Sequence, residues 1–107
     1  MNRLSLIVSL LFFLVSSLMA EKNPKVVFLH GKRSHASGDH EFKAGSHLLA
    51  KHLNKQDSVP IEAVVHPGWP KDESILDDAA AVIIYADGTS VIRSGWEKMD
   101  QLVQKGV

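Results

Sequence analysis

The sequence contains no cysteine and has no excess of charge of either sign. Its 107 residues include 12 basic and 12 acidic side chains, and 45% of the residues are apolar. Without cysteine the chain cannot be a disulfide-stapled mini-protein or a lipoprotein attached through an N-terminal cysteine. The balanced charge excludes a strongly basic nucleic-acid binder, and the apolar content excludes a polar disordered tail. We therefore expect a domain that folds without covalent cross-links and binds no nucleic acid.

Charge is also nearly absent from the N-terminal region, where Arg3 is the one charged residue among the first 20. An apolar run extends from residue 4 to 15, and a less apolar stretch ends at Ala20. This order is typical of a cleaved secretory signal peptide. The alternative is a retained membrane anchor, but a spanning helix needs about 20 apolar residues and this run is shorter. We expect residues 1–20 to be the signal peptide and residues 21–107 to be a periplasmic or secreted domain without membrane contact.

The mature region contains three apolar runs that are rich in β-branched residues. They cover residues 25–30, 61–66 and 79–86. Near-continuous apolar runs of this length are typical of strands that are buried on both faces of a parallel sheet. The sequence therefore predicts three parallel strands separated by longer crossover connections.

The first crossover has the spacing of an amphipathic helix that begins near Phe42. The residues that share its apolar face are Phe42, Gly45, Leu49, His52 and Leu53, with Leu48 beside them. We expect this face to pack on the sheet. Ser37 or Asp39 is the expected N-cap, and Pro60 prevents the helix from continuing. In the second crossover, residues 72–77 are expected to form one short helical turn.

The segment after the third strand has two interpretations. Asp87 and Gly88 between apolar runs can form a tight hairpin, in which residues 89–92 pair back onto the strand. Apolar residues then recur at helical spacing, namely Trp96, Met99, Leu102 and Val103. This recurrence favours a loop that leads into a helix between Ser94 and Gly106. We prefer the loop and helix and keep the hairpin as the alternative.

The order of these elements predicts an α/β fold with a flavodoxin-like parallel sheet and flanking helices. In that topology the first strand lies between the other two, and ligands bind beyond the carboxyl ends of strands one and three. We therefore expect His30 to lie near Asp87 and the loop of residues 32–41 to overhang the crevice. The third strand is apolar on both faces, which is typical of a strand with neighbours on both sides. Gly106 and Val107 after the last expected helix are typical of a helix end that leads into a further strand. We expect the chain to be the N-terminal part of a longer domain, truncated after the third strand and its helix.

Candidate site residues lie on the two loops that face the expected crevice. We expect His35, His40 and Glu41 from the first loop, and Asp87 and Gly88 from the second, to bind a ligand. Imidazole and carboxylate groups also bind divalent metal ions, so a metal site is an alternative, but five-residue histidine spacing is not a metal signature. A structural alternative is that His40 and Glu41 stabilise the helix N-terminus and Asp87 caps the following segment. Recognition of a polar ligand through hydrogen bonds is the preferred interpretation.

Several catalytic and phosphate-binding motifs are missing from these loops. No serine lies in a G-x-S-x-G elbow, so the sequence does not support a serine nucleophile. Neither the P-loop nor the dinucleotide glycine spacing is present, although Lys32 and Arg33 before a helix could bind an anion weakly. The remaining histidines, His47, His52 and His66, are expected to be structural or surface residues.

Motifs from the whole mature region occur together in one known family. They are Val26-Val27-Phe28-Leu29, Gly31-Lys32-Arg33-Ser34-His35, Gly38-Asp39-His40-Glu41-Phe42, Ala44-Gly45, Gly68-Trp69-Pro70 and Val82-Ile83-Ile84-Tyr85 with Asp87-Gly88. Together these motifs resemble the exported bacterial branch of the ThuA-like (trehalose-utilisation) family. The resemblance implies a class I glutamine amidotransferase-like fold and a link to carbohydrate metabolism. It places His35 and His40 on the family's histidine-bearing loop, and Asp87-Gly88 at the exit of strand three.

Two functions follow as hypotheses. The first is an exported domain that binds a sugar or another small polar ligand at the carboxyl ends of strands one and three. The alternative is a carbohydrate-active hydrolase or isomerase in which His35 or His40 is a base or metal ligand and Asp87 is its acidic partner. No cofactor is assigned beyond a divalent metal in the alternative. The absence of cysteine makes amide transfer through a thiolate impossible within this chain.

Overall fold

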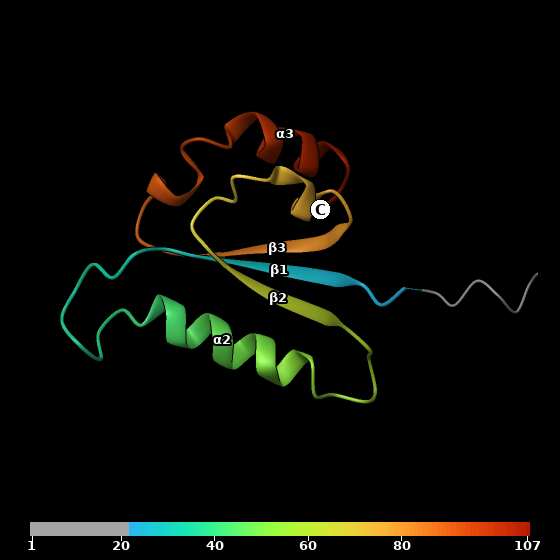
Figure 1. Ribbon diagram of the computed structural model, residues 1–107, viewed down its shortest axis with the longest axis horizontal. Helices are drawn as coiled ribbons and strands as arrows, with labels where there is room; N and C mark the ends of the chain where they lie inside the picture. Colours follow the sequence, from blue (N-terminus) through green and yellow to red (C-terminus); the bar gives the residue numbers. More distant parts are fainter. Residues whose placement is uncertain (1–21) are drawn as a thin grey trace, which may run out of the picture.

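The computed structural model describes residues 22–107, so the predicted signal peptide lies outside the described residues. A three-stranded parallel sheet has the order β2-β1-β3, with β1 at Lys25–His30, β2 at Glu62–Pro67 and β3 at Ala79–Tyr85. One face of the sheet is covered by helix α2 (Phe42–Leu53), and the other by the 3-10 helix η1 (Glu73–Leu76) and helix α3 (Trp96–Gln104) (Figure 1). This three-layer arrangement is the predicted α/β, flavodoxin-like arrangement. No helix within residues 22–107 has the length and apolar character needed to cross a bilayer.

The segment after β3 has the loop and helix that the sequence favoured. The 3-10 helix η2 (Ser90–Ile92) follows β3 and leads into α3, and no strand pairs back onto β3 within the described residues. Val91 and Ile92 are buried in this turn. The hairpin alternative is therefore wrong, because the apolar pair of η2 is used for packing rather than for strand pairing.

The core forms on both faces of β1 because successive side chains of a strand point to opposite sides. On the α3 side, Val27 and Leu29 pack with three buried residues, Leu76, Ala79 and Leu102. On the α2 side, Phe28 packs with Ala50 and Ala63. Complete burial of a side chain such as Leu29 contributes about 1.5–3 kcal/mol. The central strand therefore holds the two helical layers together.

Helix α2 packs on the sheet through Phe42, Gly45 and Leu53 of the predicted face, but Leu49 and His52 of that face are exposed. Leu48 and Leu49 are 56% and 52% exposed, whereas Ser46 and Ala50 are buried. The close approach of the helix to β3 explains this difference, because a Cβ atom on Gly45 would lie 2.7 Å from the Tyr85 ring. Small side chains therefore occupy the contact, and the two leucines are displaced to the surface.

Two further expectations about α2 and β3 are wrong in detail. The N-cap of α2 is Glu41, without a side-chain cap hydrogen bond, rather than Ser37 or Asp39. The carboxyl half of β3 is exposed rather than buried, at Ile83, Ile84 and Tyr85. This exposure arises because β3 lies at an edge of the described sheet, paired with β1 alone.

Candidate functional site

The three strands end at the same level, which brings the loops after them together. His30 at the end of β1 lies opposite Pro67 of β2 and Tyr85 of β3. The amide of Gly31 donates to the Tyr85 carbonyl at 2.9 Å, so pairing continues just beyond the strands. A Cβ atom on Gly31 would lie 2.7 Å from the Cβ of Ala86, so a glycine is needed for this close approach. The loop after β1 and the loop after β3 consequently begin side by side.

Three side chains from the loop after β1 converge on one carboxylate oxygen from the loop after β3. Nδ1 of His40 lies 3.1 Å from Oδ2 of Asp87, and Nδ1 of His35 lies 3.4 Å from the same oxygen. The Ser34 hydroxyl donates a hydrogen bond to this oxygen as well. The two imidazole rings meet edge to face, with their centres 4.0 Å apart. The sheet thus joins the predicted residues His35, His40 and Asp87 in one cluster, which we call the His–His–Asp cluster.

The cluster favours the ionised form of its carboxylate. The hydrogen bond from Ser34, followed by the hydrogen bond from His40, lowers the pKa of Asp87 below its ordinary value of 3.8. Hydrogen bonds to the charged form have this effect because they stabilise the carboxylate but not the carboxylic acid. Asp87 therefore remains an ionised acceptor into acidic solution.

The hydrogen bonds of Ser34 run in the direction opposite to those of a nucleophilic serine. An ionised carboxylate only accepts, so the single hydroxyl proton of Ser34 is directed to Asp87. Oγ of Ser34 also lies 2.9 Å from Nδ1 of His35, which then supplies the proton of that contact. In a serine-histidine-aspartate triad the serine donates to the histidine. The geometry therefore agrees with the missing G-x-S-x-G motif, and Ser34 orients Asp87.

The other two predicted site residues lie outside the His–His–Asp cluster. Glu41 accepts a hydrogen bond from the Gly38 amide at 2.8 Å and pairs with Arg33 at 3.3 Å. It therefore closes the loop on itself and fixes the segment between His35 and α2. Gly88 has a φ of +60°, a left-handed conformation that glycine adopts without strain, and it forms the turn after Asp87.

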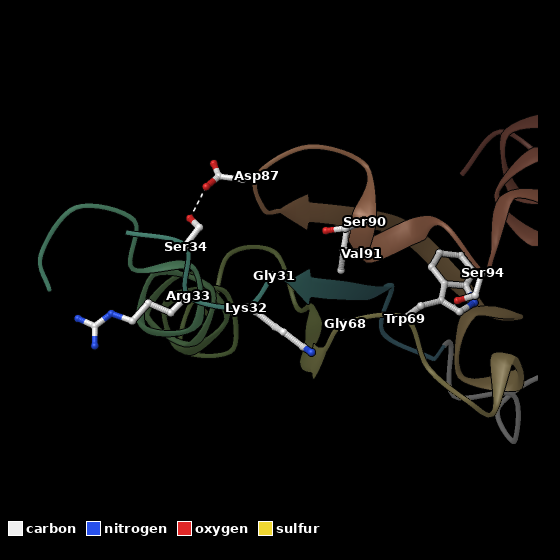
Figure 2. A pocket seen from close by; sticks show the side chains of 10 residues that line it. All are labelled: Gly31, Lys32, Arg33, Ser34, Gly68, Trp69, Asp87, Ser90, Val91 and Ser94. Carbon is white, nitrogen blue, oxygen red and sulfur yellow. Dashed lines mark hydrogen bonds between the residues drawn. The ribbon is translucent and has the colours of Figure 1, made fainter. Parts of the chain in front are cut away.

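A cavity of about 430 Å³ lies beside the cluster, over the carboxyl ends of the strands (Figure 2). Its lining residues are Gly31, Lys32, Arg33, Ser34, Gly68, Trp69, Asp87, Ser90, Val91 and Ser94. Ser34 and Asp87 mark one end, and Trp69 and Ser94 mark the other (Figure 2). The side chain of Lys32 extends toward Gly68, whereas Arg33 points away from the cavity (Figure 2). Its volume lies within the usual range for small-molecule sites, about 300–1,000 Å³.

The sequence did not identify the residues at the far end of this cavity. Trp69 was not among the expected site residues, but its indole lines the cavity and its Nε1 donates to Glu73 at 2.6 Å. The Trp69 ring packs so closely on Gly95 that a Cβ atom there would lie 1.9 Å from it. An aromatic residue directly after the second strand was the available signal, because strand exits meet at one edge of a parallel sheet.

Comparisons with known proteins do not extend this description. No protein-family model, curated protein or solved structure matches the chain.

Proposed function

We propose that the chain is a binding domain for a carbohydrate or another small polar ligand at the carboxyl ends of β1 and β3. The observation that supports this most strongly is the chemistry of the 430 Å³ cavity. It combines an amino group, a carboxylate, three serine hydroxyls and one indole ring. A few directed polar groups beside an apolar or aromatic surface are typical of sites that orient a small polar molecule.

The lining of the cavity matches the two kinds of surface that a sugar presents. Hydroxyl groups of a sugar both donate and accept, and they can pair with the carboxylate of Asp87 and with the hydroxyls of Ser90 and Ser94. The apolar C–H face of a pyranose can pack on the indole of Trp69. The amino group of Lys32 adds a donor for a ring oxygen or a carboxylate of the ligand.

This proposal is tested by titrating the full chain with trehalose, maltose, glucose and glucuronate while following the fluorescence of Trp69. The titration uses a Trp96→Phe background, because the chain has two tryptophans and Trp96 is exposed. We expect saturable binding of at least one sugar and at least about tenfold weaker binding after Ser90→Ala or Lys32→Ala, since each removes a polar partner. Lys55→Ala, on an exposed residue beyond α2, is the matched control. The absence of any saturable change with all four sugars contradicts the proposal.

The second candidate is a hydrolase or isomerase of carbohydrates. It is favoured by the contact between Nδ1 of His40 and Asp87, because a carboxylate that accepts from Nδ1 leaves Nε2 as the basic nitrogen. The His40 side chain is 42% exposed, so a ligand can reach it. Turnover of trehalose or maltose that falls after His40→Ala and not after His52→Ala supports this candidate, and lack of turnover by the parent chain eliminates it for these substrates.

We also propose that the chain is exported to the periplasm or beyond the cell and belongs with the ThuA-like family. The N-terminal charge pattern supports export, and the conjunction of motifs around His35, His40 and Asp87 supports the relationship. Mass spectrometry of the protein expressed in a bacterium tests the first part. A mature form that begins at Glu21 is expected, and an uncleaved chain in the cytoplasm contradicts export.

A further inference from the structure

We infer that His35, His40 and Asp87 bind one divalent transition-metal ion, with Zn²⁺ as the representative ion. Each residue offers one ligand atom, and the three atoms lie within 4.8 Å of one another. Two imidazole nitrogens and one carboxylate oxygen are a donor set that zinc and neighbouring transition ions prefer. The inference is independent of sugar binding, because it is tested with the ion alone.

The two nitrogen–oxygen distances inside the cluster match those between ligands of a single ion. Two donor atoms that each lie about 2.0–2.1 Å from a tetrahedral zinc are about 3.4 Å apart. The Nδ1 atoms of His35 and His40 lie 3.4 Å and 3.1 Å from Oδ2 of Asp87. In the metal-free chain the Nδ1 atoms of His35 and His40 carry the protons of their contacts with Ser34 and Asp87, so an ion binds the tautomers in which each proton lies on Nε2 and the Nδ1 lone pair is free.

The approach of the two imidazole rings supports the same inference. Their centres lie 4.0 Å apart in an edge-to-face arrangement, although the two histidines are five positions apart in the sequence. Both Nδ1 atoms lie within 3.4 Å of the same carboxylate oxygen. Two protonated imidazoles would repel each other at this distance, whereas two neutral imidazoles can direct their lone pairs to one cation.

The surroundings of Asp87 provide the support that a metal-binding carboxylate usually has. The hydroxyl of Ser34 donates to Oδ2 and fixes the orientation of the carboxyl group. Glu41 is engaged by Arg33 and by the amide of Gly38, which holds the loop that carries both histidines. Three protein ligands leave one tetrahedral position for water or for an oxygen atom of a ligand. Because Asp87 and Ser34 also line the 430 Å³ cavity, that position is available to a molecule bound there.

The test is calorimetric titration of the chelator-treated full chain with Zn²⁺, together with visible absorption spectra of the Co²⁺ form. We expect one ion per chain and the intense absorption bands of tetrahedral Co²⁺. Mg²⁺ is expected not to compete, because it prefers oxygen ligands in octahedral geometry. Octahedral Co²⁺ bands, or equal competition by Mg²⁺, contradict the inferred site.

Substitutions separate this site from adventitious binding by other histidines. His40→Ala and Asp87→Asn are expected to weaken Zn²⁺ binding by at least about 100-fold, and Ser34→Ala by about 10–100-fold, the usual effect of losing a supporting hydrogen bond. His52→Ala is the matched control, because His52 is exposed on α2 and outside the cluster. Far-UV circular dichroism of each variant verifies that it is folded. Unchanged affinity in the folded His35→Ala/His40→Ala double variant overturns the inference, as does the absence of Zn²⁺ binding by the parent chain. If the chain binds Zn²⁺ but none of the sugars, the metal site is supported and only the proposed sugar ligand is rejected.

Discussion

Nδ1 of His40 lies 3.1 Å from Oδ2 of Asp87, although the two residues are 47 positions apart in the sequence. The contact exists because β1 and β3 are parallel neighbours and end at the same level. A single pairing of strands therefore creates the cluster and one end of the cavity. Stability of the sheet and geometry of the site are consequently linked, and the following predictions test both.

The first prediction concerns which leucines of η1 and α2 are buried in the core. Leu76 of η1 is fully buried, whereas Leu48 of α2 is 56% exposed. Leu76→Ala should lower the free energy of unfolding by about 2–5 kcal/mol, since it leaves a cavity in the core. Leu48→Ala should change it by less than about 0.5 kcal/mol. Urea denaturation measures both values, and similar losses in the two variants contradict the observed face of α2.

The second prediction concerns the contact between Gly95 and Trp69. A methyl group at position 95 would overlap the indole ring, because the Cβ position lies 1.9 Å from it. Gly95→Ala should therefore destabilise the chain by about 1–3 kcal/mol through overpacking. It should also shift the Trp69 emission maximum when Trp96 is replaced by phenylalanine. Lys55→Ala, on an exposed residue beyond α2, should leave the emission maximum unchanged.

The third prediction concerns acid stability. Hydrogen bonds from Lys22 and then Lys25 lower the pKa of Asp78 from its ordinary value of 3.8 to about 2. Because the carboxyl pKa is lower in the folded state, its contribution to stability is fully present above the unfolded pKa and is lost as pH falls through about 2. The difference in unfolding free energy between the parent chain and Asp78→Asn should therefore be constant near neutral pH and decrease in acid. Gln56→Ala, on an exposed residue that does not titrate, is the control. A parent–variant difference for Asp78→Asn that grows in acid contradicts the assignment.

The fourth prediction concerns the loop that Glu41 closes. Loss of its hydrogen bond with the Gly38 amide and its ion pair with Arg33 should make local opening of the loop more frequent. A loss of about 1 kcal/mol corresponds to about a fivefold higher population of open states. Trypsin should accordingly cleave Glu41→Ala after Lys32 or Arg33 about fivefold faster than the parent chain. Glu97→Ala is the control, and equal cleavage rates would show that Glu41 does not hold the loop.

The central strand could be predicted from sequence because its signal is local. The apolar run of residues 25–30 coincides with β1, and the predicted order of strand, helix, strand, strand and helix is the order observed. Residues His35, His40 and Asp87 could be expected near one another because ligands in parallel sheets bind beyond the carboxyl ends of neighbouring strands. General rules of topology were sufficient for this part of the site.

The sequence predictions that were wrong concern side-chain contacts, which the spacing of apolar residues does not specify. Leu49 lies at helical spacing from Phe42, yet the close approach of Gly45 to Tyr85 rotates the leucine out of the contact. Helical spacing identifies a set of neighbouring residues, but the shape of the opposing surface decides which of them are buried. Trp69 was missed for the same reason, since its packing partner, Gly95, lies 26 residues later and has no side chain to indicate a contact.

The register between β1 and β3 has a consequence for the order of events during folding. Ser34, His35 and His40 belong to one side of this pairing and Asp87 to the other, so the unfolded chain holds the donor atoms apart. A slip of one residue would displace Asp87 by about 3.3 Å and separate it from both imidazoles. Any molecule or ion bound by both loops would stabilise only the correctly paired sheet. Binding would therefore raise the population of chains in which β1 and β3 are paired in the correct register.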